Sequence, residues 1–294
     1  MSAISPPIGV TRPARSAYLR GFARTVPPGI WLAGIVVVLL LLAGIAPGLF
    51  ETQNPYAVSL SQAYQGPSPH HLLGTDNLGR DEFSRMVAGT RLSLLIGFGA
   101  TAIGVVAATV LGILAGLGGK FADLVVSRFL EVLFGYPVLF LALLVVSVSG
   151  ANLTTEILAV GIGTTAGYAR MLRGQILSVR NAGYIEAARA VGHPYRKIIW
   201  QHILPNAVRP LVALFTLGVG SAVIWASGLS FLGLGVPPPS PEWGALLDAG
   251  KEYITTAWWL EIAPGAAVVL LALSVTVLGR HLQDRLEGRI RTQV

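Results

Sequence analysis

Long apolar runs, separated by shorter polar segments, are the main feature of the hydrophobic pattern along this chain. No residue between Arg24 and Glu51 is charged, and the first run covers residues 29–50. A helix needs about 20 mostly apolar residues to cross the hydrocarbon core of a bilayer. Five further runs lie within residues 91–120, 121–148, 153–169, 209–242 and 258–278. The pattern predicts an all-α membrane protein with six transmembrane helices.

The alternative interpretation of the first run is a cleaved signal peptide, whose apolar region would span about 7–15 residues. The run is longer than that, and similar runs follow it, so a retained helix is favoured. The chain then divides into a cytoplasmic N-terminal tail, a first transmembrane helix, an extracytoplasmic segment, a five-helix core and a cytoplasmic C-terminal tail. These parts are residues 1–28, 29–50, 51–90, 91–283 and 284–294, and the core includes a cytoplasmic loop at 174–206.

The positive charges orient the predicted helices. Six spans place both termini on one side of the membrane. If that side is cytoplasmic, sixteen Lys and Arg residues lie in cytoplasmic segments and four in extracytoplasmic ones. Cytoplasmic loops carry the excess of Lys and Arg in membrane proteins, so both termini are predicted to be cytoplasmic. The same distribution accounts for the net charge of +7, and no nucleic-acid partner is expected.

Composition indicates a chain that lies mostly in lipid. It is 53% hydrophobic and 12% charged, whereas soluble domains carry about 25% charged residues. There is no Cys, which excludes disulfides and thiolate metal sites. Many of the 35 Gly residues lie inside the apolar runs. Small residues let membrane helices approach closely, so helix packing is the favoured role for these glycines.

The segment between the fourth and fifth runs is polar and rich in Arg. Asn181 is expected to cap a helix over residues 184–191, since Asn favours the N-cap position. Gly192 suits the left-handed residue that ends a helix. Pro194 suits the first turn of a second helix, which Pro205 is expected to end. The prediction is a helix–turn–helix on the cytoplasmic surface, with a solvated amphipathic connector as the alternative.

This loop resembles the signature loop of ABC importer permeases. Glu186-Ala-Ala is followed after three residues by Gly192, and Leu204-Pro205 come after a further gap. The form His202-Ile-Leu-Pro-Asn resembles the peptide-importer branch of that family. Glu186 lies three residues before Arg189, so the two are expected to pair with each other or with a partner.

Two other segments resemble dipeptide/oligopeptide permeases of the C type, and the resemblance then extends over about residues 25–290. The first is Gly74–Asp81 with Ser84, Arg85, Gly89, Arg91, Ser93 and Leu94, and the second is Ser230–Gly235 with Pro237, Pro238, Trp243 and Gly244. The C-terminal end departs from the pattern. Gly279-Arg280 and Leu282-Gln283-Asp284 stand where the family usually has Gly-Asp and Leu-Arg-Asp.

The resemblance implies the type I ABC importer permease fold. It implies a pore-forming permease subunit of an ATP-driven, binding-protein-dependent importer of dipeptides, oligopeptides or peptide-like solutes. The implied partners are a second homologous permease subunit, two ATP-binding subunits or domains, an extracytoplasmic substrate-binding protein and the lipid of a bacterial cytoplasmic (inner) membrane. ATP and Mg would bind to the ATPase partners, and this chain would hold no cofactor or metal and would not be an enzyme.

The resemblance also implies two functional segments. In this family a short coupling helix of the loop inserts into a cleft on the ATPase subunit. The matching coupling residues are Tyr184, Glu186, Ala187, Ala188, Arg189, Gly192, His193, Leu204 and Pro205. The extracytoplasmic motif, which serves structural positioning or docking of the binding protein, comprises Gly74, Thr75, Asp76, Gly79, Arg80 and Asp81.

Isolated ionisable and aromatic residues lead to further predictions. Arg128 and Glu131 are three apart and are expected to pair. Pro137 is expected to kink the third helix. Glu156 lies near a membrane end and is expected to reach water. An interfacial aromatic belt is predicted from Trp243, Trp258 and Trp259.

The sequence limits the other classes of function. It has no Gly-x4-Gly-Lys-Ser/Thr phosphate loop, and its five His residues lack metal-ligand spacing. A membrane-embedded enzyme would need convergent reactive side chains in the spans, and none is evident. The alternative to an importer subunit is a self-sufficient secondary transporter or channel. Uptake driven only by an ion gradient would favour that alternative.

Overall fold

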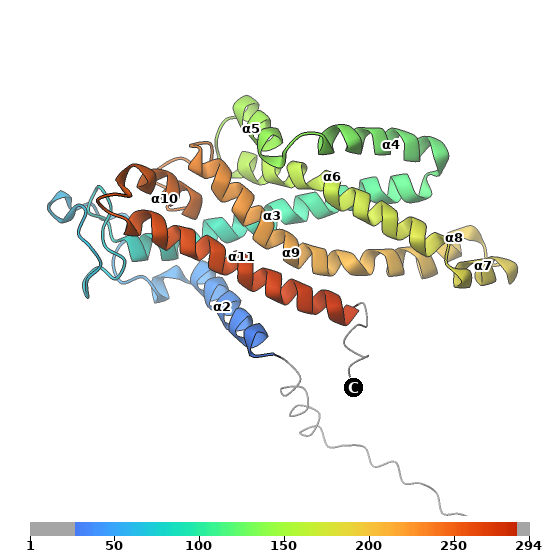
Figure 1. The fold of residues 1–294 in the computed structure, drawn as a ribbon, viewed down its shortest axis with the longest axis horizontal. Helices are drawn as coiled ribbons and strands as arrows, with labels where there is room; N and C mark the ends of the chain where they lie inside the picture. Colours follow the sequence, from blue (N-terminus) through green and yellow to red (C-terminus); the bar gives the residue numbers. More distant parts are fainter. Residues whose placement is uncertain (1–26, 287–294) are drawn as a thin grey trace, which may run out of the picture.

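The computed structural model describes residues 27–286, and the regular elements in this range are helices (Figure 1). They are α2 (Pro28–Ile45), α3 (Glu82–Leu117), α4 (Gly119–Phe134), α5 (Val138–Ser149), α6 (Leu153–Arg180), α7 (Gly183–Ala190), α8 (Tyr195–Ile198), α9 (Leu204–Phe231), α10 (Trp243–Gly250) and α11 (Trp259–Leu286). Short 3-10 turns occupy Pro47–Leu49, Leu60–Gln62 and Lys251–Tyr253, and a π-helical turn occupies Ile199–Ile203. Most of both predicted tails, residues 1–26 and 287–294, lies outside the described residues.

The helices form an elongated bundle with two irregular ends (Figure 1). α3, α6, α9 and α11 run along its long axis, and α2 packs against α11 and α3. Helix α6 contacts α3, α4, α5 and α9, most extensively α3. The 51–81 segment and α10 lie at one end, whereas α7 and α8 lie at the other. The two segments that carry sequence motifs are thus held at opposite ends of the bundle.

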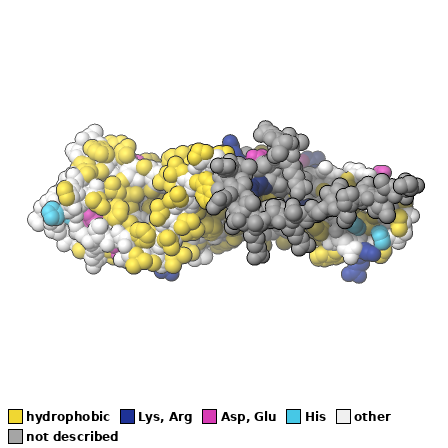
Figure 2. Space-filling model, turned by 90° about the horizontal axis from the view of Figure 1, so that it is seen from below, with side chains coloured by type: hydrophobic (Ala, Val, Ile, Leu, Met, Phe, Trp, Pro, Cys, Tyr) yellow, Lys and Arg dark blue, Asp and Glu magenta, His cyan; other side chains and the backbone are white. Residues whose placement is uncertain are grey.

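Four described helical stretches are long and apolar enough to cross a membrane: Pro28–Ile45, Glu82–Leu117, Tyr195–Phe231 and Trp259–Leu286. The α4–α5 pair is a fifth if it counts as one broken span. On the face that Figure 2 draws, hydrophobic side chains cover much of the surface that grey atoms do not hide. Helix α6 is less apolar, because it contains Glu156 near its start and Arg170, Arg173 and Arg180 in its C-terminal part. The all-α membrane fold is confirmed, whereas the count of six spans stays a prediction.

The predicted third helix is broken in two. α4 and α5 meet at an angle of 89° across residues 135–137. Pro137 has no N–H to donate and disfavours helical backbone at Tyr136, so one helix does not continue through this point. The single helix predicted within 121–148 is therefore wrong. The kink expected at Pro137 is confirmed, as a full change of direction.

Helix α3 begins earlier than its apolar run predicts. It starts at Glu82 rather than near Arg91, because Asp81 caps it by accepting a hydrogen bond from the Ser84 N–H (2.9 Å). A capping carboxylate satisfies one of the backbone donors that the first turn leaves without a partner. The Gly74–Asp81 motif therefore leads directly into the first turn of a membrane-length helix.

The fourth and fifth runs also differ from the helices that contain them. α6 continues to Arg180 instead of ending near residue 169, and α9 ends at Phe231, before the limit of its run at 242. Apolar runs indicate only the part of a helix that suits hydrocarbon. Backbone hydrogen bonding continues beyond that part in α6, where the side chains become polar.

Pro205 does not end a helix, contrary to the prediction. Residues Tyr195–Phe231 form one long helical stretch that passes through Pro205. Just before it, Leu204 donates its N–H to the carbonyl of Ile199, five residues earlier. Such a π turn widens the helix. The wider turn accommodates a proline ring that would otherwise crowd the carbonyl four residues before it.

Glycines bring α3 and α6 into close contact. A Cβ added at Gly161 of α6 would lie 2.9 Å from the carbonyl oxygen of Ala100 on α3. A Cβ added at Gly116 of α3 would lie 2.6 Å from the side chain of Ile176 on α6. In lipid, dispersion between close atoms replaces the hydrophobic effect as the force that holds helices together. The packing role predicted for the glycines is confirmed at this crossing.

Gly161→Leu is expected to push α6 away from α3 and to lower the free energy of unfolding by about 1–3 kcal/mol, as overpacking does in other cores. Gly174→Ala on the same helix is the control, because nothing lies within 4 Å of a Cβ there. The measurement is the thermal unfolding midpoint of the purified chain in detergent. Equal midpoints for the two variants would contradict the close-contact interpretation.

Candidate functional site

Helix α7 presents a polar face at its end of the bundle. Tyr184, Glu186, Ala187 and Arg189 are exposed, and Ala188 is half-buried. Glu186 and Arg189 make no hydrogen bond or ion pair through their side chains within the described chain. The charges of this face are therefore available to a partner.

Ile185 anchors α7 from the opposite face. Its side chain is 0% exposed and packs in a cluster with Leu172 and Ile176 of α6. The same cluster contains Ile198 of α8 and Ile203, which precedes α9. Residues of both long helices that flank the loop thus pack in one cluster with Ile185. Sequence reasoning did not single out Ile185, although it is the one large aliphatic residue within α7.

The ends of α7 agree only partly with the prediction. Gly192 has φ +85°, the left-handed conformation expected for the residue that ends this helix, and the His193 N–H donates to the Ala188 carbonyl at 3.2 Å. Asn181 does not cap α7, and that prediction is wrong. Ala182 holds the capping position without a side-chain bond, and Asn181 instead follows the last residue of α6.

The remaining predicted coupling residues lie beyond α7. His193 is half-buried, with Nδ1 3.5 Å from Nζ of Lys197. Leu204 is half-buried and Pro205 is exposed in the first turn of α9. These two residues belong to the long helix that follows the loop rather than to the exposed face of α7.

Asp76 organises the 51–81 segment at the other end. Its carboxylate accepts hydrogen bonds from the N–H groups of Leu78 and Arg80, each at 2.9 Å, and from Arg80 Nε at 2.6 Å. Nε of Arg85 lies 3.5 Å from the same carboxylate. Asp76 and Arg85 are both buried. The Asp76 carboxylate is thus satisfied by its neighbours, whereas Nε of the buried Arg85 makes an ion pair but no hydrogen bond.

Asp81 and Thr75 connect this segment to two helices. Asp81 accepts a hydrogen bond from Ser84 Oγ at 2.7 Å and lies 3.0 Å from Nδ1 of His71. Trp259, at the start of α11, donates its Nε1–H to the Thr75 carbonyl at 3.2 Å. The segment is therefore held against α3 and α11 by buried polar contacts.

Gly74 and Gly79 are required by backbone geometry. Their φ angles are +74° and +72°, a region that residues with a Cβ adopt only under strain. A Cβ at Gly79 would also lie 1.8 Å from the carbonyl oxygen of Ser59. The geometry of the whole motif favours structural positioning over direct contact with a binding protein. Its role stays a prediction.

Two of the three tryptophans predicted for an interfacial belt are buried. Trp243 donates its Nε1–H to the carbonyl of Met86 at 3.0 Å, and Trp259 packs at the 51–81 segment. Only Trp258 is exposed, at 54%. The prediction of an interfacial belt is therefore wrong for Trp243 and Trp259. Their rings instead pack between elements that are distant in the sequence.

Glu156 does not reach water, contrary to the prediction. It is 0% exposed, and the hydroxyl of Ser230 on α9 donates to its carboxylate at 2.7 Å. By contrast, the pair predicted between Arg128 and Glu131 is confirmed at 2.7 Å on the exposed surface of α4. Arg128 and Glu131 lie on the same helix, so their spacing in the sequence is enough to predict the pair. Ser230, which contacts Glu156, comes from a different helix.

A cavity of about 390 Å³ lies beside the break between α4 and α5. Its walls come from the break itself, from α6 and from α9, and include Tyr136, Pro137, Gly163, Thr164, Gly167, Tyr168, Ser221 and Trp225. Hydroxyl groups, aromatic rings and glycine backbone meet at this cavity. Such a wall can contact both the amide groups and the apolar side chains of a solute. Among these residues the sequence indicated Pro137 as a kink, and Gly163 and Gly167 only as small residues for helix packing.

The family of the chain follows from comparison with known proteins. Residues 108–292 match the model of the binding-protein-dependent transport system inner membrane component. The chain belongs to this family. The permease is 35% identical to the dipeptide transport system permease protein DppC of Alkalihalophilus pseudofirmus, over 98% of this chain and 95% of that protein. It is 38% identical to the glutathione transport system permease protein GsiD of Pectobacterium atrosepticum, over 88% and 87% of the two chains.

Solved structures show the same fold at lower similarity. The permease matches a chain of an amino acid ABC transporter with a TM-score of 0.57 and 22% identity, covering 68% of this chain and 94% of that chain. A chain of the inward-facing MetNI methionine ABC transporter matches with a TM-score of 0.56 and 21% identity, covering 69% of this chain and 96% of that chain. At these identities the similarity concerns the fold.

These comparisons confirm the resemblance that three motifs had indicated. The chain is a permease subunit of a binding-protein-dependent ABC importer. Its relatives are membrane subunits rather than enzymes. Membership of this family decides against the self-sufficient secondary transporter, which needs no separate binding protein.

Asp76→Ala is expected to leave Arg85 of the permease buried without its counter-charge, and removing one partner of a buried ion pair costs about 3–5 kcal/mol. Glu252→Ala, which removes an exposed carboxylate at the same end of the bundle, should change little. The measurement is the yield of folded permease from membranes together with its unfolding midpoint. If Asp76→Ala matched the control, the carboxylate would not hold the segment together.

Proposed function

We propose that this permease forms the pore of an ATP-driven importer for dipeptides, oligopeptides or peptide-like solutes in a bacterial cytoplasmic membrane. The observation that carries the solute class is the similarity, over nearly the whole chain, to permeases named for dipeptide and glutathione transport. Both solutes are short peptides with amide groups and charged ends. The cavity beside the α4–α5 break is the proposed contact surface, since Thr164, Ser221 and Tyr168 offer it hydroxyl groups.

The proposed topology has six spans, with the α4–α5 pair as the third and α6 as the fourth. Both termini and α7 then lie on the cytoplasmic side, in agreement with the excess of Lys and Arg in those segments. The proposed partners are a second homologous permease, two ATP-binding subunits or domains, and an extracytoplasmic substrate-binding protein. ATP and Mg belong to the ATP-binding partners in this proposal.

Coupling is proposed to pass through α7. Its exposed face, with Glu186 and Arg189, would dock on an ATP-binding partner, and closure of the two partners on ATP would move α7. Ile185 would transmit this movement, because its cluster joins α6 and α9. Packed cores transmit such shifts as rigid-body motions between discrete states. The helices would thereby alternate between inward-open and outward-open arrangements.

Glu186→Lys is expected to reverse the charge of the docking face and to lower ATP-dependent uptake at least about tenfold, the effect of losing one charge-assisted contact. The ATP-binding partners should also be lost when the tagged chain is purified in mild detergent. Glu252→Lys is the control, since it makes the same change at the opposite end of the bundle. Wild-type uptake with wild-type amounts of protein would contradict the coupling role of α7.

Gly192→Val is expected to weaken coupling between ATP hydrolysis and uptake, because it disturbs the backbone conformation of the turn and no side-chain contact. The left-handed conformation costs a residue with a Cβ about 1–2 kcal/mol, and nothing lies within 4 Å of the added Cβ. Gly183→Val is the matched control, because that position is equally open but lacks a positive φ. The measurement is ATP-dependent uptake at equal membrane levels. A several-fold loss restricted to Gly192→Val is expected, and equal uptake by both variants would contradict it.

A further inference from the structure

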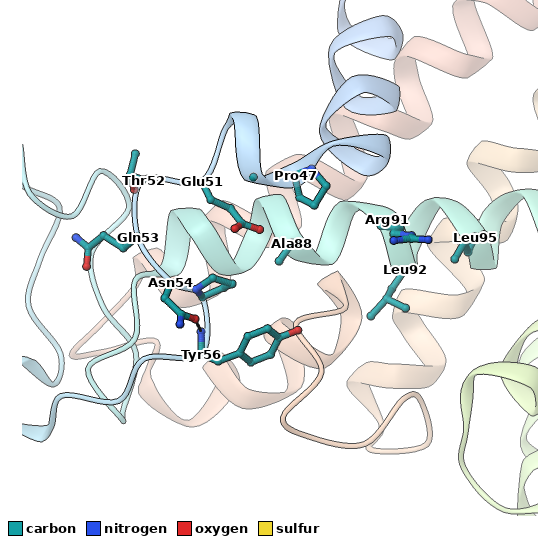
Figure 3. Close-up of a pocket in the computed structure, with 12 residues that line it drawn as sticks. Pro47, Glu51, Thr52, Gln53, Asn54, Tyr56, Ala88, Arg91, Leu92 and Leu95 are labelled. Atoms are coloured by element: carbon teal, nitrogen blue, oxygen red, sulfur yellow. Dashed lines mark hydrogen bonds between the residues drawn. The ribbon is translucent and has the colours of Figure 1, made fainter.

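A groove runs along the N-terminal half of α3, beside the end of α2 (Figure 3). Its wider part, of about 910 Å³, lies between the polar 51–56 segment and the α3 residues Ala88, Arg91 and Leu95. Its narrower part, of about 310 Å³, lies between α2 and α3. Arg91 and Leu95 line both parts, so the groove is continuous.

The wider part carries one positive and one negative side chain without partners. Arg91 is exposed and Glu51 is half-buried, and neither side chain makes a hydrogen bond or ion pair with another described residue. In Figure 3, Glu51 reaches over α3 near Ala88, and Arg91 lies further along the same helix. The groove therefore offers separate positions for an anion and a cation. Arg91 also belongs to the segment that resembles the peptide permeases, yet the proposed transport function assigns it no role.

The narrower part is apolar. Leu41 and Ile45 of α2 face Leu94 and Phe98 of α3 across it. The two helices approach closely, since a Cβ at Gly44 would lie 3.0 Å from the Leu94 side chain. Both helices are long and apolar enough to cross a membrane. The narrower part thus lies at the depth of acyl chains. Arg91 lies beside Gly44 in the last turn of α2, and Glu51 follows the end of α2, so both charges lie close to the depth of headgroups.

We propose that this groove binds one molecule of phosphatidylethanolamine. The phosphate lies on Arg91, the ammonium on Glu51, and one acyl chain in the apolar part between α2 and α3. A guanidinium binds phosphate oxygens through two parallel hydrogen bonds, and a carboxylate pairs with an ammonium group. Phosphatidylglycerol has no ammonium group, so Glu51 would face an anionic lipid without compensation. A short peptide carries both charges at its termini but leaves the apolar part unfilled.

The test is native mass spectrometry. The full chain is purified together with the partner subunits that remain bound to it, and the complex is then incubated with equal amounts of phosphatidylethanolamine and phosphatidylglycerol. The wild type is expected to retain one phosphatidylethanolamine in preference to phosphatidylglycerol. Arg91→Ala should lower this retention at least about tenfold, because it removes both hydrogen bonds from the guanidinium to the phosphate. Glu51→Gln should remove the preference between the two lipids. Arg128→Ala, which removes an exposed arginine on α4, should change neither quantity.

Leu95→Trp separates lipid binding from a folding defect, because it fills the apolar part while leaving both charges in place. It should lower phosphatidylethanolamine retention with unchanged recovery of the complex. Equal retention of both lipids by the wild type, or unchanged retention in Arg91→Ala, would overturn the proposal. So would displacement of the lipid by the tripeptide Ala-Ala-Ala. A photo-crosslinker at Leu95 provides a last criterion, since crosslinks to a partner subunit instead of lipid would show that protein fills the groove.

Discussion

In a bilayer the hydrophobic effect no longer favours helix contact over lipid contact, so α3 and α6 are held together by dispersion between closely spaced atoms. Gly161 and Gly116 permit that spacing, because any larger residue at either position would meet the facing helix. Once α6 is fixed against α3, its remaining surface receives α4, α5 and α9. Both the cavity at the α4–α5 break and the cluster around Ile185 are built on this helix.

The two sequence motifs at the ends of the bundle use their charged residues in opposite ways. At one end Asp76 and Asp81 are buried and saturated by hydrogen bonds, which makes the 51–81 segment a rigid cover on α3 and α11. At the other end Glu186 and Arg189 are exposed and without side-chain partners in the described chain. Buried polar groups are stable only when they are paired, whereas exposed charges can meet a partner at little cost.

The break at Pro137 has a role that a straight span would not provide. A continuous helix would close the side of the bundle, whereas the 89° turn leaves the cavity between the break, α6 and α9. Non-helical backbone at membrane depth is tolerated where it lines a cavity or is covered by protein. The outer surface of α4 and α5 also exposes large apolar side chains, among them Phe121, Phe129 and Phe140.

The sequence by itself determined the helical class, the approximate positions of the membrane-length helices and the left-handed turn at Gly192. Each of these depends on a run of neighbouring residues or on one backbone conformation, so local chemistry is sufficient. The three motifs identified the family for the same reason, because their residues are contiguous or nearly so. Only the tertiary structure decided that Glu156 is buried, that Ile185 anchors α7 and that Arg91 faces a groove. Those properties depend on atoms from other helices. Ser230, which contacts Glu156, lies 74 residues away in the chain. No local sequence pattern specifies which distant helix will pack against Glu156.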